Sequence, residues 1–181
     1  MKKEEAISLL NEFVESESLM RHCKSVAGSM SYFARKYGED EEKWYVTGLI
    51  HDFDYEKHPD QHPQIGEGIL RERGVSEEII RAIQSHADYT GVSRDSLMEK
   101  TLFAVDELSG FVVACAYMRP DKFKGMEVKS VKKKLKDKAF AAAVSREHIA
   151  QGAVELGMEL DELIQCVIDA QNEVAEELGF A

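Results

Sequence analysis

The chain has 181 residues, of which 44% are hydrophobic and 31% are charged, and its formal net charge is −11. This composition is typical of a globular domain with its own core, and the acidic balance argues against general affinity for nucleic acid. The longest apolar stretch, residues 101–118, carries two acidic residues in its middle, so no membrane span is expected. The N-terminus lacks the apolar segment of a signal peptide, and the three cysteines are widely spaced. We therefore expect a cytoplasmic protein.

Helical periodicity recurs along the chain and strand signals are scarce, so we predict an all-α fold. The first strong pattern places Leu19, Cys23, Val26, Met30 and Phe33 on one helix face, and that helix should end at Gly38. Further helices are expected over residues 40–51, 63–74, 76–88, 93–118, 129–144, 145–157 and 159–179. Ser76 is the expected N-cap of the fourth of these eight helices. We treat residues 1–181 as a single domain with a C-terminal helical extension from about residue 120.

Histidines gather in the first half of the chain. Five of the six lie between residues 22 and 86, namely His22, His51, His58, His62 and His86. Taken singly, several have ordinary interpretations: His22 as a solvated helix residue, His62 as a loop or cap residue, and His86 as a cation at a helix C-terminus. His58 is interpreted as a solvated loop residue, and His148 as a structural or surface residue.

Two stretches combine apolar residues with ionisable ones in a way that calls for partners. "GLIHDFDYE" (48–56) ends an apolar run in His51 and Asp52, and "LFAVDELSGFVV" surrounds Asp106 with apolar neighbours. A buried imidazole or carboxylate requires a cation, hydrogen bonds or a proton. Imidazoles and carboxylates on separate helices are what a helical bundle uses to hold metal in its core. Nitrogen and oxygen ligands without thiolate favour Mn, Fe, Co, Ni, Zn or Mg.

The order of these residues resembles that of the HD-domain metal-dependent phosphohydrolase superfamily. His22 comes first, the adjacent pair His51 and Asp52 follows, and Asp106 comes last. His62 and His86 lie between the pair and the last aspartate, as in the extended pattern that typically binds two metal ions. "GLIHDFDYE", "SHAD", "LFAVDELSGF", "RPDKF" and "KSVKKKLKDKAFAAAVSRE" resemble one uncharacterised, HDIG-like subgroup of predicted HD hydrolases. This resemblance covers nearly the whole chain.

The resemblance implies an all-α HD-domain helical bundle with the metal site in its core. It places one divalent ion among His22, His51, Asp52 and Asp106. A second ion would lie at His62 and His86, with Asp52 bridging the two. The implied reaction is hydrolysis of a small phosphorylated or nucleotide substrate by a metal-activated water, with Asp52 in the catalytic centre.

Some positions depart from the family pattern or are left open by it. Related motifs often place a lysine three residues after the aspartate, where this chain has Tyr55. Asp54 is a second catalytic candidate, which either orients the nucleophilic water or holds a metal ligand by a hydrogen bond. Residues 119–138 carry nine Lys or Arg against three Asp or Glu. We expect Lys132, Lys133 and Lys136 to bind substrate phosphate in place of the missing lysine, the alternative being a solvated helix face.

Two other classes of function use the same residues. An HD-fold di-iron oxygenase would employ the same ligands, and metal identity and oxygen consumption would discriminate it from a hydrolase. A non-catalytic binding module would hold a structural metal, although a purely structural site rarely needs two ions with open positions.

Overall fold

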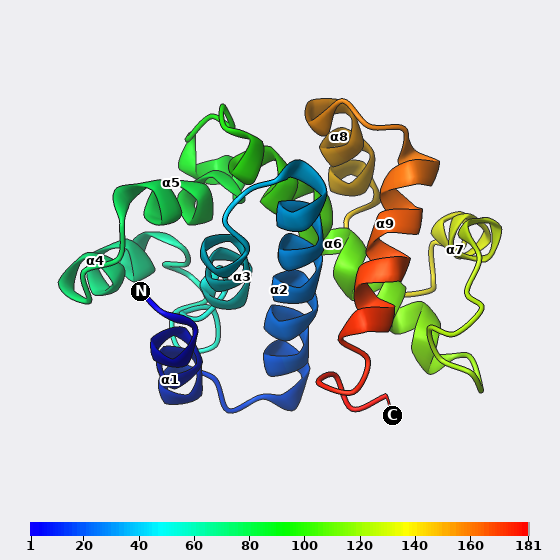
Figure 1. Ribbon diagram of the computed structural model, residues 1–181, viewed down its shortest axis with the longest axis horizontal. Coiled ribbons are helices and arrows are strands. Elements are labelled where there is room, and N and C mark those ends of the chain that lie inside the picture. Colours follow the sequence, from blue (N-terminus) through cyan, green and yellow to red (C-terminus); the bar gives the residue numbers. More distant parts are fainter. Residues whose placement is uncertain (181) are drawn as a thin grey trace.

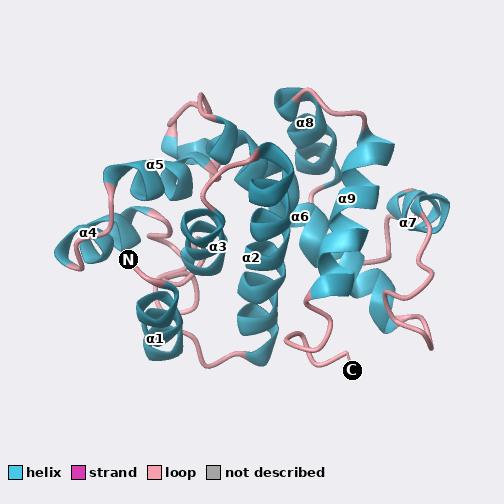
Figure 2. Cartoon of the chain, in the orientation of Figure 1, coloured by secondary structure: helices cyan, strands magenta, loops and turns pink. Residues whose placement is uncertain are grey.

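The computed structural model describes residues 1–180. Within these residues the chain forms nine α-helices, one short 3-10 helix and no strand (Figure 2). The helices are α1 (Lys3–Phe13), α2 (Glu17–Tyr37), α3 (Glu41–Ile50), α4 (Gln64–Glu72), α5 (Glu77–Ser85), η1 (Asp88–Thr90), α6 (Leu97–Tyr117), α7 (Val128–Leu135), α8 (Arg146–Leu156) and α9 (Leu160–Glu173). The predicted all-α class is confirmed. Among the described helices, none combines the length and apolarity that crossing a membrane requires.

The two longest helices, α2 and α6, pack together near the centre of the molecule (Figure 1). Helices α1, α3, α4 and α5 lie to one side of this pair, and α7, α8 and α9 lie to the other. Each side has its own apolar cluster. Leu49, Phe53 and Ile80 belong to the first cluster, and Phe111 and Val167 belong to the second. Helix α2 contributes apolar side chains to both clusters, whereas those of α6 belong to the second, so α2 ties the two sides together.

Local sequence signals explain several helix boundaries. The side chain of Ser16 accepts a hydrogen bond from the Leu19 amide at the start of α2. Gly38 ends the same helix with a φ of 72°, a left-handed conformation that glycine adopts without steric cost. Ser96 and Glu99 form a reciprocal capping box at the start of α6. The predicted end of α2 at Gly38 is confirmed.

Ser76 occupies the N-cap position of α5, as predicted, although its side chain accepts no hydrogen bond from that helix. Two of the predicted helices extend too far toward the C-terminus. The helix expected over residues 129–144 ends at Leu135, because Arg146 holds the following turn by donating to backbone carbonyls there, including those of Ala141 and Val144. The last helix ends at Glu173 instead of residue 179.

Candidate metal centre

Six histidine and aspartate side chains converge from five separate segments. His22 lies in the second turn of α2 and Asp106 in the middle of α6. His51 and His86 are the C-caps of α3 and α5. The remaining two are Asp52, in the turn after α3, and His62, in the loop before α4. Because α3 ends at Ile50, the adjacent residues His51 and Asp52 lie where the chain turns, and both side chains reach the same place.

The first group brings four of these side chains together. The Nε2 atom of His22 lies 3.1 Å from Oδ1 of Asp106 and 3.5 Å from Oδ2 of Asp52. The Nε2 atom of His51 lies 3.3 Å and 3.5 Å from the same two oxygens, and 3.2 Å from Nε2 of His22. Ligand atoms that each lie about 2.1 Å from a shared ion are about 3.0 Å apart in octahedral and about 3.4 Å apart in tetrahedral coordination. These separations match those of donor atoms around a metal ion.

The second group uses the other oxygen of Asp52. Oδ1 of Asp52 lies 3.1 Å from Nε2 of His62 and 3.3 Å from Nε2 of His86. The two imidazole nitrogens are 3.3 Å apart. His51 lies between the groups: it can share a metal ion with His22 and Asp106, or with Asp52 and His86. The cluster can therefore hold a divalent metal ion.

Hydrogen bonds on the opposite ring nitrogens fix the orientation of three imidazoles. The Nδ1–H group of His51 donates to the Gly48 carbonyl at 2.7 Å, and that of His86 donates to the Ile83 carbonyl. The Nδ1–H group of His62 donates to Oδ1 of Asp54 at 2.7 Å. When Nδ1 carries the hydrogen, a neutral imidazole presents the lone pair of Nε2, which is the form that binds metal.

Asp54 lies behind His62 rather than in front of the cluster. It is 1% exposed, and its second oxygen accepts a hydrogen bond from the Gly66 amide at 2.9 Å. Both carboxylate oxygens are thus engaged with the protein. Of the two roles expected for Asp54, the geometry favours holding a ligand over orienting a water molecule.

The electrostatics of the cluster favour positive charge. Burial opposes protonation of His62, but the carboxylates of Asp52 and Asp54 outweigh it and raise the pKa of His62 to about 9. The pKa of His51 and that of His86 are also raised, again against burial, by the nearby carboxylates of Asp52 and Asp106. Burial opposes ionisation of Asp52 as well, yet the surrounding imidazoles hold its pKa well below the usual range. Protons stabilise the ligand set here in the way that a metal cation would.

The cluster opens into a cavity of about 520 Å³. Five of the six converging residues line it, and the buried His51 lies behind them. The remaining lining residues are Tyr55, Ala87, Asp88, Tyr89, Glu107 and His148. Among the described lining residues, none is Lys or Arg.

The predicted phosphate-binding lysines do not contribute to this cavity. Lys132 and Lys136 lie on and just after α7, beside a different groove that Arg146, Ile149 and Leu160 also line. Lys132 forms an ion pair with Asp161 at 2.6 Å. Helix α7 lies on the opposite side of the molecule from α4 and α5 (Figure 1). The structure therefore corrects the placement of Lys132, Lys133 and Lys136, since a basic run in the sequence does not show which way its helix faces.

The sequence indicates a structural or surface role for His148, and the structure adds that this partly exposed residue lines the cavity. It lies in the first turn of α8, and α8 packs against α6 next to Asp106. No motif spacing links residue 148 to the histidines before residue 90, so packing between distant helices is what brings it there.

Comparison with known proteins agrees with this arrangement. A family model described as "HD domain" matches residues 19–110, about half of the chain, from the start of α2 to the middle of α6. Ribonuclease Y of Oleidesulfovibrio alaskensis is 31% identical over 98 residues, which cover 52% of this chain and 18% of that protein. The chain thus spans less than a fifth of that relative's length. No solved structure matches this chain. The matched segment contains all six converging residues, and the chain belongs to the HD domain family.

Proposed function

We propose that the protein is a metal-dependent phosphohydrolase with two divalent ions. His22, His51, Asp52 and Asp106 would hold one ion, and His62, His86 and Asp52 would hold the other. The observation that carries this proposal is the position of Asp52. Oδ1 of Asp52 lies 3.1 Å from Nε2 of His62 and 3.3 Å from Nε2 of His86. Oδ2 lies 3.5 Å from Nε2 of both His22 and His51. HD domains generally belong to metal-dependent phosphohydrolases, which agrees with this arrangement.

When bound, divalent ions supply Lewis acidity and lower the pKa of water. The chain contributes the rest of the chemistry. Asp52 and Asp106 provide the negative charge that retains cations at the cavity floor. Asp54 keeps His62 in the tautomer that binds metal. The partly enclosed cavity leaves room for one small phosphorylated molecule above the cluster.

The cavity favours a small substrate over long nucleic acid. A protein that follows a nucleic acid backbone needs a track of basic side chains. This chain carries a net charge of −11, and its described cavity wall contains Asp88 and Glu107 without Lys or Arg. The similarity to a protein named Ribonuclease Y supports phosphoester chemistry, and the charge around the cavity supports a nucleotide-sized substrate.

The first test is elemental analysis of protein purified without chelator, followed by a panel of phosphomonoesters and phosphodiesters. Two ions per chain and phosphate or nucleotide release would support the proposal. One ion per chain would contradict the dinuclear assignment. Metal without hydrolysis of any phosphoester would favour a non-catalytic module.

The oxygenase alternative uses the same ligands, so oxygen dependence is the discriminating measurement. A hydrolase uses Lewis acidity without changing the oxidation state of its metal. Metal-free protein loaded with Mn²⁺ under nitrogen should therefore hydrolyse the substrates identified in the panel. Activity that requires iron and oxygen, with measurable oxygen uptake, would overturn the hydrolase assignment.

A further inference from the structure

His148 is a cavity imidazole that lies outside the metal cluster. The other lining histidines, His22, His62 and His86, all face carboxylate oxygens of Asp52 or Asp106. His148 instead faces Asp88, another lining residue, with its Nε2 atom 3.4 Å from Oδ2 of that residue. Its side chain is 37% exposed, so the ring is open to whatever enters the cavity.

Three contacts hold His148 in this position. The Ser145 side chain accepts a hydrogen bond from the His148 amide and begins α8 at that point. The ring of Phe103, on α6, lies against the His148 ring with centroids 5.3 Å apart. Together with Asp88, these contacts place the imidazole on a helix end rather than on a mobile loop.

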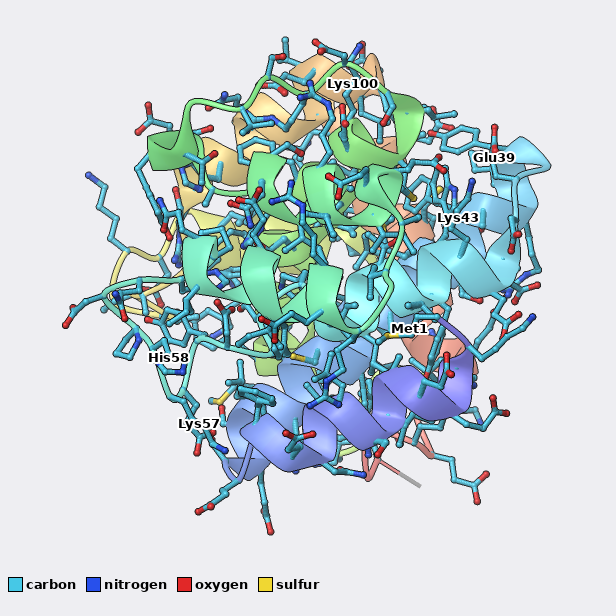
Figure 3. The ribbon with its side chains drawn as sticks, turned by 90° about the vertical axis from the view of Figure 1, so that its left-hand side faces the viewer. Met1, Glu39, Lys43, Lys57, His58 and Lys100 are labelled. Atoms are coloured by element: carbon cyan, nitrogen blue, oxygen red, sulfur yellow. The ribbon has the colours of Figure 1, made fainter. Side chains whose placement is uncertain are left out.

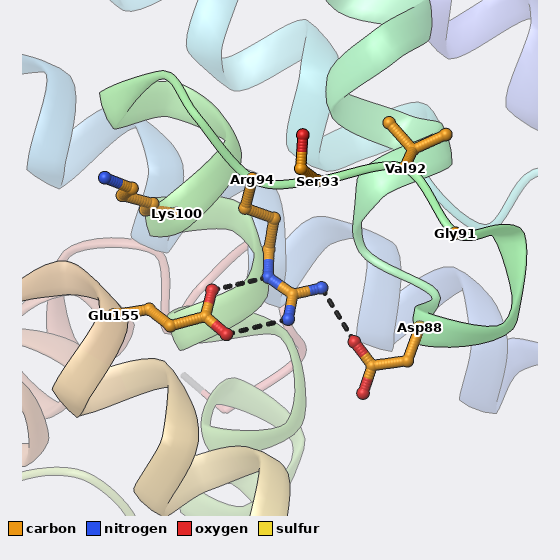
Figure 4. Close-up of a pocket in the computed structure, with 7 residues that line it drawn as sticks. All are labelled: Asp88, Gly91, Val92, Ser93, Arg94, Lys100 and Glu155. Atoms are coloured by element: carbon orange, nitrogen blue, oxygen red, sulfur yellow. Dashed lines mark hydrogen bonds and ion pairs between the residues drawn. The ribbon is translucent and has the colours of Figure 1, made fainter.

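Asp88 is itself anchored from behind. Its Oδ1 atom accepts a hydrogen bond from Arg94 at 2.8 Å (Figure 4). The guanidinium of Arg94 also pairs with both oxygens of Glu155, at 2.6 Å and 2.8 Å, and lies 3.7 Å from the ring centroid of Phe103. These partners surround the Arg94 guanidinium, and its side chain is only 8% exposed. Its role is to position Asp88, while Asp88 positions His148.

Several other proton donors on the cavity wall are already engaged. The hydroxyl of Tyr89 donates to the His62 carbonyl. The Nδ1–H groups of His62 and His86 donate to Asp54 and Ile83. For His148, by contrast, the described residues offer no hydrogen-bond partner to Nδ1. This nitrogen is free to donate a proton to a bound molecule.

We propose that His148 is the general acid that protonates the leaving group, an inference that rests on the phosphohydrolase function proposed above. A water molecule adds to phosphorus and gives up a proton to solvent. The bond between phosphorus and the leaving oxygen breaks, and the Nδ1 proton of His148 passes to that oxygen. The products are inorganic phosphate and an alcohol, and solvent returns a proton to the imidazole. Asp88 is the positioning residue for this step.

This role predicts a specific dependence on the leaving group. An alkoxide, such as the 5′-oxygen of a nucleoside, leaves slowly unless it is protonated, whereas 4-nitrophenolate leaves readily without a proton. General acid catalysis typically contributes about 10²- to 10⁴-fold. In His148→Gln, kcat for a nucleoside 5′-monophosphate should fall about 100-fold or more, while kcat for 4-nitrophenyl phosphate should change by less than about threefold. Asp88→Asn should show the same pattern with a smaller loss.

The matched control is His58→Gln, since His58 lies in the loop after α3 (Figure 3) and is not among the residues that line the cavity. A second readout is the metal content of each variant, which should equal that of the wild type. Equal loss on both esters, a change confined to KM, or loss of metal in His148→Gln would overturn the acid role. Failure of the wild-type protein to hydrolyse either ester would instead overturn the phosphohydrolase function itself, and the acid role with it.

Discussion

His62 and Asp54 form a buried pair in which the Nδ1–H group of the imidazole donates to the carboxylate at 2.7 Å. The opposite nitrogen of His62 lies 3.1 Å from Asp52. Asp54 thus sets the tautomer of His62, and the opposite nitrogen of that ring faces Asp52. This arrangement is common behind metal-binding histidines, where the outer carboxylate orients the ligand and raises its basicity.

The first prediction concerns that outer carboxylate. Asp54→Asn keeps the shape of the side chain but removes its charge, so His62 should lose basicity and orientation. We expect the affinity for the ion at His62 and His86 to fall about 10- to 100-fold, with the other ion retained. Metal titration followed by elemental analysis would measure this. Asp60→Asn, in the exposed part of the same loop, is the control. Equal affinity in Asp54→Asn and wild type would contradict the role assigned to Asp54.

The second prediction uses two glycines of α4. A Cβ atom at Gly66 would lie 2.7 Å from Oδ2 of Asp54 and 3.0 Å from the ring of Phe53. Gly66→Ala should therefore displace Asp54, weaken the same metal ion and destabilise the fold by about 1–3 kcal/mol. At Gly68 an added Cβ meets nothing within 4 Å.

Gly68→Ala is the matched control for that experiment, because it lies two residues away in the same helix. Alanine in an open helix position should stabilise the protein by about 0.5–1 kcal/mol and leave metal binding unchanged. Thermal denaturation and metal titration of both variants check the pair. Wild-type metal affinity in Gly66→Ala would show that Asp54 is not held where the structure places it.

The third prediction follows from the corrected position of the lysines. Lys132 and Lys136 lie beside a groove separate from the metal cavity. Replacing both with Gln should leave KM for a phosphoester unchanged within about twofold at physiological salt, since exposed charges that do not contact the substrate are screened. Steady-state kinetics at low and high ionic strength test this. If KM is raised at low salt and returns to the wild-type value at high salt, these lysines do take part in substrate binding.

The extent to which the sequence predicts this molecule differs between its parts. Helix periodicity and caps such as Gly38 are local signals, so most helices can be predicted from neighbouring residues. The converging histidines and aspartates can be predicted because their order resembles a family pattern. The cavity wall depends on the packing of α8 against α6, which no local signal encodes. The proximity of His148 and Asp88 is therefore seen only in the structure. The side of the molecule on which Lys132 lies cannot be predicted from its charge.

The fourth prediction concerns pH. In the metal-free protein the pKa of His62 is raised to about 9, above the ordinary histidine value of about 6.5. The stabilisation from this group is fully present below pH 6.5 and is lost as the pH rises through about 9. The melting temperature of chelator-treated protein should therefore decline across this range. Asp54→Asn should flatten that decline, and an unchanged slope in the variant would contradict the cause assigned here.

Metal binding must displace the same proton, because only a deprotonated Nε2 coordinates a cation. Adding Zn²⁺ to metal-free protein at pH 7 should release protons, and its affinity should rise with pH up to about 9. Calorimetric titration in two buffers of different ionisation enthalpy measures the number released. Identical heats in the two buffers would show that no proton leaves, against the charge state described for the cluster.

The last prediction separates the two ions through Asp52 and His86. Asp52 faces both histidine groups, whereas His86 lies 3.3 Å from His62 and from one oxygen of Asp52. Asp52→Ala should therefore lose both ions, while His86→Ala should lose mainly one. His58→Ala, outside the cavity, should retain both. Elemental analysis of the three variants, each checked for helical circular dichroism, gives the ion count directly. Two ions retained by a folded Asp52→Ala would rule out a bridging carboxylate. Equal loss in the Asp52 and His86 variants would show instead that the ions bind only as a pair.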